Sequence, residues 1–411
     1  MCVWHLFVAT QWFLWLKKSE MLLALGIGAI CLIAGGIYGY STGDQLRYLP
    51  DEAEYVSLAT NLAQKYLYSL DGLQPTAYKP PGYPLILGAV RWLGGNIVSF
   101  RLINFVLFVG GLFFLYQLAR QTGGVGAGLL SVILATAGYP VLFYTANTLY
   151  PQTLAGFLFL AVIWLYERRV SGIWQGLLVG IVWGWLILTV PTFVFTFLLF
   201  GLAYCFIRRQ KKFFGWIGVG TFLILGLWTI RNYVVFHDFV WIATNSGYNL
   251  LLGNSEKTTF NSGTNVDIQK YLDAAEGMGE LEKDRYFRTQ AIAYILAHPA
   301  EAIQFYLLKT VNFFNFRNEL TTRSETSLAR EALMGVTYGA LLLLALLRLV
   351  GSQRFKLTSF ESLLYAVYVG NAFWGAIFFN RIRFRLPYDY LLILLSAIFL
   401  SQFIASRYEN S

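Results

Sequence analysis

Three carboxylates gather in the stretch PDEAEYVSLATNL, which follows the first apolar run long enough to cross a membrane. Pro50 suits the first turn of a helix, and Asp51, Glu52 and Glu54 suit its positive end. A carboxylate beside an apolar surface can have its pKa raised towards a value that suits a general base. The same acids can instead only stabilise the start of the helix, by roughly 0.3–1 kcal/mol each. Position alone therefore leaves both functions open.

The apolar positions of this helix recur at helical spacing and predict one stripe that faces lipid or protein, formed by Tyr55, Leu58, Ala59, Leu62, Ala63 and Tyr66. Asp51 and Glu52 lie on the two flanks of that stripe. Glu54 is expected to point away from it, towards Asn61 and Lys65.

A lysine stands on a stiff turn about thirty residues further along the chain. Lys79 in YKPPG is followed by two prolines, which restrict the backbone on either side of them. Outside the membrane and close to it, such a cation suits the binding of a lipid phosphate. Snorkelling of the side chain to the lipid headgroups is the alternative.

Three arginines alternate with apolar residues in FFNRIRFRLPYDY. Their spacing of two predicts that Arg381, Arg383 and Arg385 share one side of an extended segment, with Pro387 limiting helix at the preceding residue. Guanidinium groups fixed in this way suit a phosphate. Pairing with headgroups or with acids of 267–284, or an inverted topology at this segment, is the alternative.

Composition predicts an all-α polytopic membrane protein. Of 411 residues 57% are hydrophobic and 13% charged, too few charges to cover a soluble protein of this length, and apolar runs of about 20 residues recur. The net charge of +9 lies mostly in short loops, as the positive-inside rule expects, so nucleic-acid binding is not predicted. The cysteines and histidines show no metal-ligand spacing, and we expect no cofactor, a divalent metal being possible but unsupported.

Apolar length and the positions of Lys and Arg predict about ten spans, near 21–40, 98–119, 123–143, 148–167, 172–188, 190–207, 213–231, 331–350, 358–379 and 388–405. The parity of the basic clusters places the loop 41–97 wholly outside. Residues 301–316 are expected to lie along the surface. We divide the chain into a transmembrane module (1–231, including the loop 41–97), an extracytoplasmic region (232–330) and C-terminal transmembrane helices (331–411).

The order of these motifs resembles that of the GT-C glycosyltransferases that use polyprenyl-phosphate sugars: one span, PDEAEY, KPPGYP, then six spans. The closest resemblance is to the protein O-mannosyltransferase family, which includes the lipid A aminoarabinose transferase. FRLINF, TIRNYVVF, TNSGYNLLLGN and RFRLPYDYLLILL are also similar to the family's motifs. The resemblance covers most of residues 45–400 and is looser beyond Leu250. It implies a GT-C fold with juxtamembrane helices in the first external loop.

The resemblance assigns the catalytic carboxylate to Asp51 and the donor-phosphate lysine to Lys79. We expect a supporting role for Glu52, the neighbour of Asp51. The arginines of the alternating segment and Arg231 become further candidates for the phosphate. Candidates for substrate contact are Tyr55, Tyr83, Gln152, Asn245 and Asn249. At Gln152 the chain departs from the family, which often carries a second acid there.

The function expected from these residues is an inverting transfer of a sugar from a polyprenyl-phosphate donor to an acceptor hydroxyl. It would take place on the extracytoplasmic face of the cytoplasmic membrane, with Asp51 as general base. The acceptor, a lipid, a protein or a polysaccharide, stays open, as does the sugar. A flippase or transporter of lipid-linked sugars, which binds without chemistry, is the alternative function.

Overall fold

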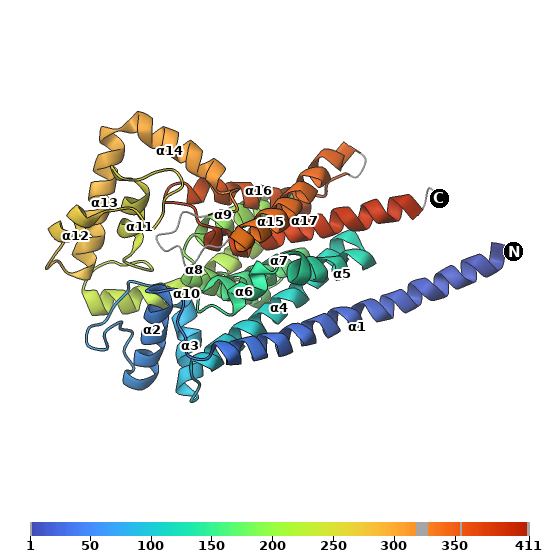
Figure 1. Ribbon diagram of the computed structural model, residues 1–411, viewed down its shortest axis with the longest axis horizontal. Helices are drawn as coiled ribbons and strands as arrows, with labels where there is room; N and C mark the ends of the chain where they lie inside the picture. Colours follow the sequence, from blue (N-terminus) through green and yellow to red (C-terminus); the bar gives the residue numbers. More distant parts are fainter. Residues whose placement is uncertain (1, 318–327, 354–355, 409–411) are drawn as a thin grey trace.

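The computed structural model describes residues 2–317, 328–353 and 356–408, and every regular element in these ranges is a helix. The prediction of an all-α, multi-pass membrane protein is confirmed. The first helix α1 (Cys2–Thr42) enters from the end of the molecule that also holds the C-terminus. It leads to two short helices at the opposite end, α2 (Asp51–Lys65) and α3 (Gly82–Trp92) (Figure 1).

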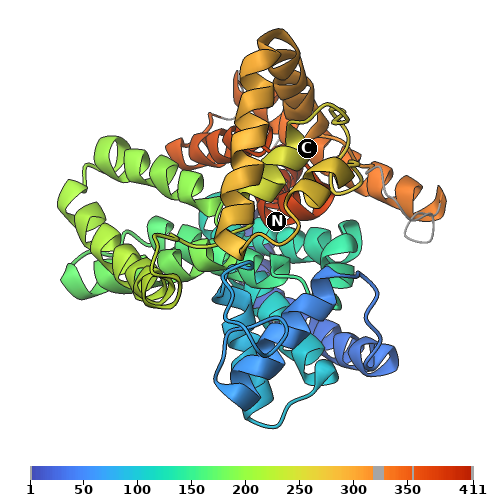
Figure 2. The ribbon, with the colours of Figure 1, turned by 90° about the vertical axis from the view of Figure 1, so that its left-hand side faces the viewer.

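The central part of the chain is a bundle of apolar helices. Its members are α4 (Ile97–Gly123), α5 (Val125–Ile133) with a π-helical continuation to Gly138, α6 (Val141–Ala146), α7 (Gln152–Glu167), α8 (Ile173–Thr189), α9 (Phe193–Leu202) with a π-helical continuation to Ile207, and α10 (Lys211–Phe236). A second group of helices lies beside α2 and α3 at the same end of the molecule (Figure 2): α11 (Ser246–Gly253), α12 (Gln269–Ala274), α13 (Glu280–Ala297) and α14 (Pro299–Asn312). The chain closes with α15 (Leu328–Val350), α16 (Ser359–Gly375) and α17 (Ile382–Tyr408).

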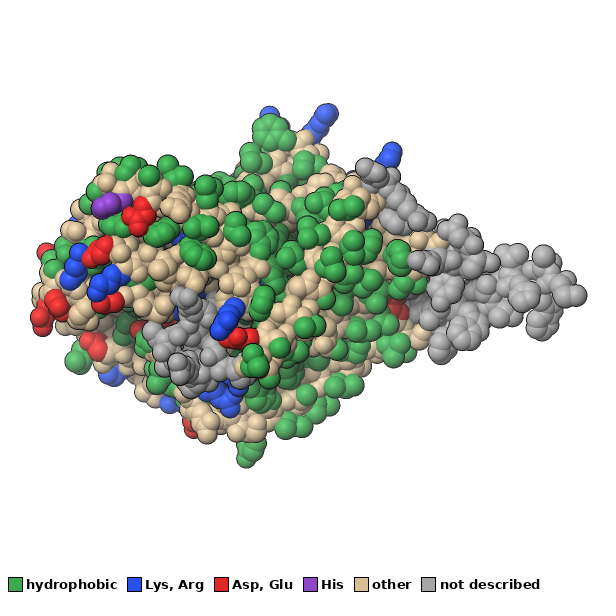
Figure 3. Space-filling view, turned by 45° about the horizontal axis from the view of Figure 1, so that its top comes forward, with side chains coloured by type: hydrophobic (Ala, Val, Ile, Leu, Met, Phe, Trp, Pro, Cys, Tyr) green, Lys and Arg blue, Asp and Glu red, His purple; other side chains and the backbone are tan. Residues whose placement is uncertain are grey.

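Five described helices are long and apolar enough to cross a membrane, namely Ser19–Thr42 of α1, α4, α10, α15 and Ile382–Ser406 of α17. Every predicted span overlaps a described helix, but the span 123–143 covers both α5 with its π-helical continuation and the start of α6. The number of crossings stays a prediction, as do the domain boundaries. Figure 3 shows hydrophobic side chains over the middle of the visible face, with charged side chains gathered towards the α12 and α13 end.

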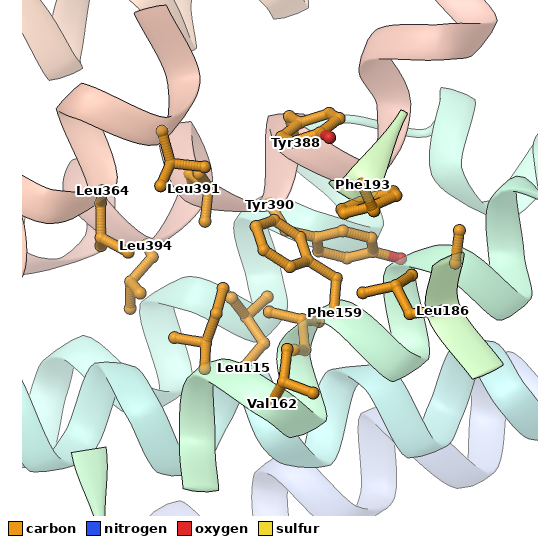
Figure 4. Close-up of a cluster of buried hydrophobic side chains, with 14 of the residues drawn as sticks. Leu115, Phe159, Val162, Leu186, Phe193, Leu364, Tyr388, Tyr390, Leu391 and Leu394 are labelled. Atoms are coloured by element: carbon orange, nitrogen blue, oxygen red, sulfur yellow. The ribbon is translucent and has the colours of Figure 1, made fainter. Parts of the chain in front are cut away.

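Helix α17 is the centre of the hydrophobic core. Its Tyr388 ring stacks on Phe193 of α9, with 4.7 Å between ring centroids. Tyr390, Leu391 and Leu394 of the same helix are fully or almost fully buried beside side chains of α4, α7, α8 and α16 (Figure 4). Because α17 is surrounded in this way, its first residues have a fixed position at the end of the bundle where α2 and α3 lie.

Helices α8 and α10 approach each other closely through glycines. A Cβ atom added at Gly180 would meet the backbone of Ile217 and, at 2.8 Å, the Cα atom of Gly220. Small residues let membrane helices pack backbone to backbone. The two helices therefore pack closely side by side.

The segment 80–96, predicted not to cross the membrane, contains one short helix, and its place outside stays a prediction. Its helix α3 has 11 residues and a length of about 16 Å, too short for a hydrocarbon core of about 30 Å. Helix α14 has exposed apolar residues, as expected for a surface segment, but its Lys309 is buried and donates to the carbonyl oxygens of Gly253 and Phe378. One face of α14 is thus fixed to the protein by a cation that satisfies backbone acceptors.

Candidate active site

Helix α2 begins at Asp51, directly after Pro50. The predicted apolar stripe is confirmed at its first positions, since Tyr55, Leu58 and Ala59 are buried. Tyr55 packs edge-on against Tyr83 of α3, with 5.3 Å between ring centroids. This contact holds the first turn of α2 against α3 and fixes the direction of the Asp51 side chain.

Asp51 lies between two cations. The Nζ atom of Lys79 donates to Oδ1 at 2.6 Å, and the Nη1 atom of Arg383 donates to Oδ2 at 2.6 Å. The three residues come from α2, from the loop before α3 and from the second residue of α17. Of the residues that the sequence proposed for the site, the structure brings these three into direct contact.

Glu54 belongs to the same group, which corrects the prediction that it points towards Asn61 and Lys65. Its Oε2 atom lies 2.8 Å from Nζ of Lys79. Residues three apart on a helix are neighbours on its surface, so Asp51 and Glu54 can reach one cation. The prediction failed because the position of Lys79 is a long-range contact that the helix alone does not reveal.

The backbone before Lys79 is fixed at several points. The hydroxyl of Tyr68 donates to the carbonyl oxygen of Lys79 at 2.9 Å, and Arg231 donates to that of Thr76 at 2.8 Å. Glu280 of α13 accepts from the backbone nitrogen of Ala77 at 2.8 Å. Arg231 thus helps to hold the loop before Lys79, and its binding of the donor phosphate stays a prediction.

The electrostatics of the group favour charged side chains. Burial alone raises the pKa of Asp51, but the charges of Arg383 and Lys79 outweigh it and lower the pKa to about 2. Burial lowers the pKa of Lys79, because it disfavours the charged form of a lysine, but Tyr55, Asp51 and Glu54 together raise this pKa well above its usual value. Asp51 is therefore a carboxylate, and Lys79 a cation, over the whole physiological range.

Glu52 points away from this group and is fully buried. Its Oε2 atom accepts from the backbone nitrogens of Arg47 and Tyr48, at 2.7 and 3.2 Å. Its Oε1 atom accepts from the backbone nitrogen of Leu149 at 2.9 Å. The side chain thus joins the loop before α2 to the turn before α7, and a supporting role in catalysis stays a prediction.

The prediction of an extended arginine strip is wrong. Arg383 and Arg385 are in the first turn of α17, and Pro387 lies inside the helix. Residues two apart on a helix differ by about 200° in direction, so the two side chains diverge. Arg385 is buried, pairs with Asp389 and donates to the carbonyl oxygen of Phe313 at 2.6 Å. Arg381 donates to Thr264 at 2.6 Å.

The candidates for substrate contact differ in their surroundings. Tyr83 is fully buried behind Tyr55 and is hydrogen-bonded to Asn104. Gln152 starts α7, and its buried Oε1 atom has no hydrogen-bond partner in the described part of the chain. Asn245 and Asn249 are half-buried at the start of α11. Contact with a substrate stays a prediction for all of them.

Two aromatic residues of the site were not among the predicted residues. The Arg383 guanidinium lies 4.8 Å from the ring centroid of Tyr150. Burial and then the charge of Glu54 raise the pKa of Tyr248, a residue of α11 that Lys79 and Asp51 also influence. Both tyrosines stand in motifs singled out in the sequence, NTLYPQT and TNSGYNLLLGN, but only their amide neighbours had been chosen. Within 2–317, 328–353 and 356–408, no three His, Cys, Asp or Glu side chains are grouped as metal ligands.

No protein-family model and no curated protein sequence matches the chain. Among solved structures, the chain is similar to ArnT from Cupriavidus metallidurans with undecaprenyl phosphate bound. The TM-score is 0.42, with 12% sequence identity over 94% of this chain and 78% of that chain. ArnT in the apo state gives a TM-score of 0.39, with 13% identity over 96% and 76%. Both TM-scores lie below 0.5, so the function proposed below rests on the site geometry and on the sequence motifs.

Proposed function

We propose that the chain is a membrane glycosyltransferase that moves a sugar from a polyprenyl-phosphate donor to an acceptor hydroxyl, with inversion at the anomeric carbon. One observation carries the proposal: each oxygen of Asp51 accepts a hydrogen bond from a cation, Lys79 or Arg383, at 2.6 Å. The motifs around these three residues predict a base and two phosphate ligands. Their convergence from three distant segments supports those assignments.

The donor phosphate would bind where Asp51 now accepts its hydrogen bonds. Lys79 and Arg383 can donate either to the Asp51 carboxylate or to the donor phosphate, whose oxygens accept hydrogen bonds from both side chains. The buried Nε atom of Arg383 has no hydrogen-bond partner in the described part of the chain. A phosphate oxygen supplies such a partner, because a guanidinium can donate from two nitrogens in parallel. Glu54 keeps a negative charge beside Lys79 while Asp51 is released.

The released Asp51 then acts as general base. It takes the proton from the acceptor hydroxyl as that oxygen attacks the anomeric carbon of the sugar. The bond between the anomeric carbon and the phosphate oxygen breaks, and its electron pair leaves with the polyprenyl phosphate. Lys79 and Arg383 stabilise the negative charge that develops there.

The site would face the extracytoplasmic side. The long loop with α2 and α3 lies at the end of the bundle opposite both termini (Figure 1). The basic clusters Arg168, Arg169, Arg208 and Arg209 stand in the short connections after α7 and α9, the connections expected in the cytoplasm. The polyprenyl chain would then lie along the apolar helices below the phosphate.

A flippase for lipid-linked sugars is the second candidate. The pair Arg385–Asp389 favours it, since buried charges inside a helix bundle often mark a transport path. This pair has its own partners, however: Asp389 also accepts from Tyr139 at 2.7 Å and from Tyr368 at 3.0 Å. A closed set of buried contacts fits a structural pair better than a substrate path.

The test uses purified full-length protein with a polyprenyl-phosphate sugar and candidate lipid, protein and polysaccharide acceptors. A glycosyltransferase releases free polyprenyl phosphate, whereas a flippase leaves the donor intact. Asp51→Asn should lower turnover about a hundredfold or more, because the amide cannot accept the proton. Asp44→Asn, an exposed acid of the same loop, is the matched control and should keep full activity. Near-normal turnover of Asp51→Asn would remove Asp51 from the mechanism.

A further inference from the structure

A pocket of about 840 Å³ opens between the beginnings of α8 and α10, far from Asp51. Helix α10 reaches both places: its Lys211 lines the pocket, and its Arg231 contacts the loop that carries Lys79. At a rise of 1.5 Å per residue, these two residues are about 30 Å apart. The pocket is thus a separate feature at the opposite end of the bundle.

The pocket is strongly cationic. Arg209, Lys211 and Lys212 line it, and no carboxylate of the described residues is part of its lining. All three side chains are exposed. Glu167, the acid at this end of α7, forms an ion pair with Arg208 and so does not neutralise them. Within the part of the chain that the structure describes, no carboxylate therefore pairs with the three positive charges around this hollow.

The backbone adds to this positive potential. Helix α10 starts at Lys211 and helix α8 follows Gly172, and neither start has a side-chain cap or an acid in its first turn. The first backbone N–H groups of a helix have no partner within it. Lysines in the first turn also oppose the helix dipole, which favours anions at that end. A bound anion would offset both costs.

Two aromatic residues of the lining, Phe206 and Trp216, face outwards. Phe206 is 71% exposed and Trp216 is 38% exposed. In a membrane protein, exposed aromatic side chains next to cations are typical of the boundary between headgroups and acyl chains. The pocket thus combines a site for an anion with an apolar edge, which is the chemistry of a phospholipid rather than of a soluble phosphate.

We propose that this pocket binds the phosphate group of an anionic membrane lipid, with Arg209, Lys211 and Lys212 around the phosphate and Phe206 and Trp216 along the first acyl carbons. Basic pockets between membrane helices are suited to such headgroups. The positive-inside rule alone accounts for cations at this end of the bundle. The rule does not account for the grouping of these cations around one hollow. Arg168 and Arg169 show the difference, because they are exposed at the same end of the bundle but do not line the pocket.

The test measures lipid binding to delipidated, full-length protein in neutral detergent. Short-chain phosphatidylglycerol, short-chain phosphatidylcholine and inorganic phosphate are titrated separately, with native mass spectrometry as the readout. Phosphatidylglycerol should bind saturably, and Lys211→Ala with Lys212→Ala should weaken it about tenfold or more. Arg168→Ala with Arg169→Ala removes the same charge from the same end and should change the affinity less than about twofold.

Three results would overturn the proposal. Equal losses in the two double variants would assign the binding to the general surface potential. Phosphatidylcholine binding as tightly as phosphatidylglycerol would show that the cations do not select an anionic headgroup. Displacement of the lipid by an equal concentration of inorganic phosphate would mean that the pocket prefers a soluble anion. Thermal unfolding without lipid checks that the exposed substitutions leave the fold intact, and Arg209→Gln provides a second, single substitution with the same expected direction.

Discussion

The Oε1 atom of Glu280 lies 2.8 Å from the backbone nitrogen of Ala77, two residues before Lys79. Its Oε2 atom accepts from the Thr76 hydroxyl at 2.6 Å. Glu280 is the first residue of α13, in the region 232–330 that the sequence predicts to be extracytoplasmic. The position of Lys79 therefore depends on a carboxylate that lies about two hundred residues further along the sequence.

Glu280→Ala should raise the KM for the donor about tenfold, because the loss of two charge-assisted hydrogen bonds leaves the Lys79 loop less fixed. The value of kcat should change less. Glu280→Gln keeps one acceptor oxygen and should have an intermediate KM. Steady-state kinetics with a polyprenyl-phosphate sugar provide the measurement. Glu282→Ala, an exposed acid of the same helix turn, is the control. A wild-type KM for Glu280→Ala would show that the loop keeps its position without this contact.

Glu52→Gln should destabilise the protein by about 1–3 kcal/mol. The carboxylate accepts from backbone nitrogens through both of its oxygens, whereas the amide has only one acceptor oxygen. Thermal unfolding in detergent measures the effect, with Asp44→Gln as control for the same loop. The folded fraction should keep its kcat. Normal stability combined with a lost kcat would instead place Glu52 in the chemistry.

The loop 41–97 should react with an impermeant thiol reagent from one side only, the extracytoplasmic side. Leu73 and Leu93 are suitable positions for single cysteines, since they are 77% and 79% exposed and lie before and after α3. Ser69 of the same loop is fully buried and therefore unsuitable. Labelling of only one of the two positions from outside would mean that α3 crosses the membrane.

Local patterns and the family resemblance contributed differently to the prediction of the site. Helical spacing predicted the buried stripe of α2, whereas the roles of Asp51 and Lys79 came from the resemblance, since the acidic start and the KPPG turn alone left them open. Their mutual contact was not predictable from spacing, because it depends on how α2 packs against the loop before α3. The position of Glu54 beside Lys79 was missed for the same reason.

The arginine segment shows a different limit. Alternation suggested an extended strand, and Pro387 suggested a break in the helix. In α17 the proline removes one backbone hydrogen bond, to the carbonyl oxygen of Arg383, close to the helix start. The buried pair between Arg385 and Asp389 at spacing i, i+4 supports the helix there. The arrangement is thus decided by tertiary packing around a helix whose sequence locally resembles a strand.

Arg383 and Arg385 should respond differently to substitution by alanine. Arg383→Ala should weaken donor binding about tenfold or more, because it removes one of two cations proposed for the phosphate. Arg385→Ala should instead destabilise the protein by about 3–5 kcal/mol, since it leaves Asp389 buried without its partner. Donor affinity and thermal unfolding, measured on both variants, separate the effects.

The double variant Arg385→Ala with Asp389→Ala is the control, since it removes both buried charges and should recover part of the stability. If Arg383→Ala binds the donor as tightly as the wild type, the phosphate assignment of Arg383 is wrong.

The pH dependence of turnover should reveal the release of Asp51 by the donor. Without donor, Arg383 and Lys79 hold the pKa of Asp51 at about 2, so it is charged above about pH 3. The profile of kcat/KM, which reports the free enzyme, should therefore lack an acid limb from Asp51 between about pH 5 and pH 8.

With donor bound, the phosphate takes the two cations and the burial that raises the pKa remains. The acid limb of kcat should consequently lie at a higher pH than that of kcat/KM. Lys79→Gln removes one of the charges that lower the pKa, so its kcat/KM limb should also move to higher pH. Asp51→Asn has no carboxylate to titrate and is the control for any limb from another group. Identical acid limbs in the wild-type kcat and kcat/KM profiles would mean that both cations stay on Asp51 during turnover, which would exclude it as the base.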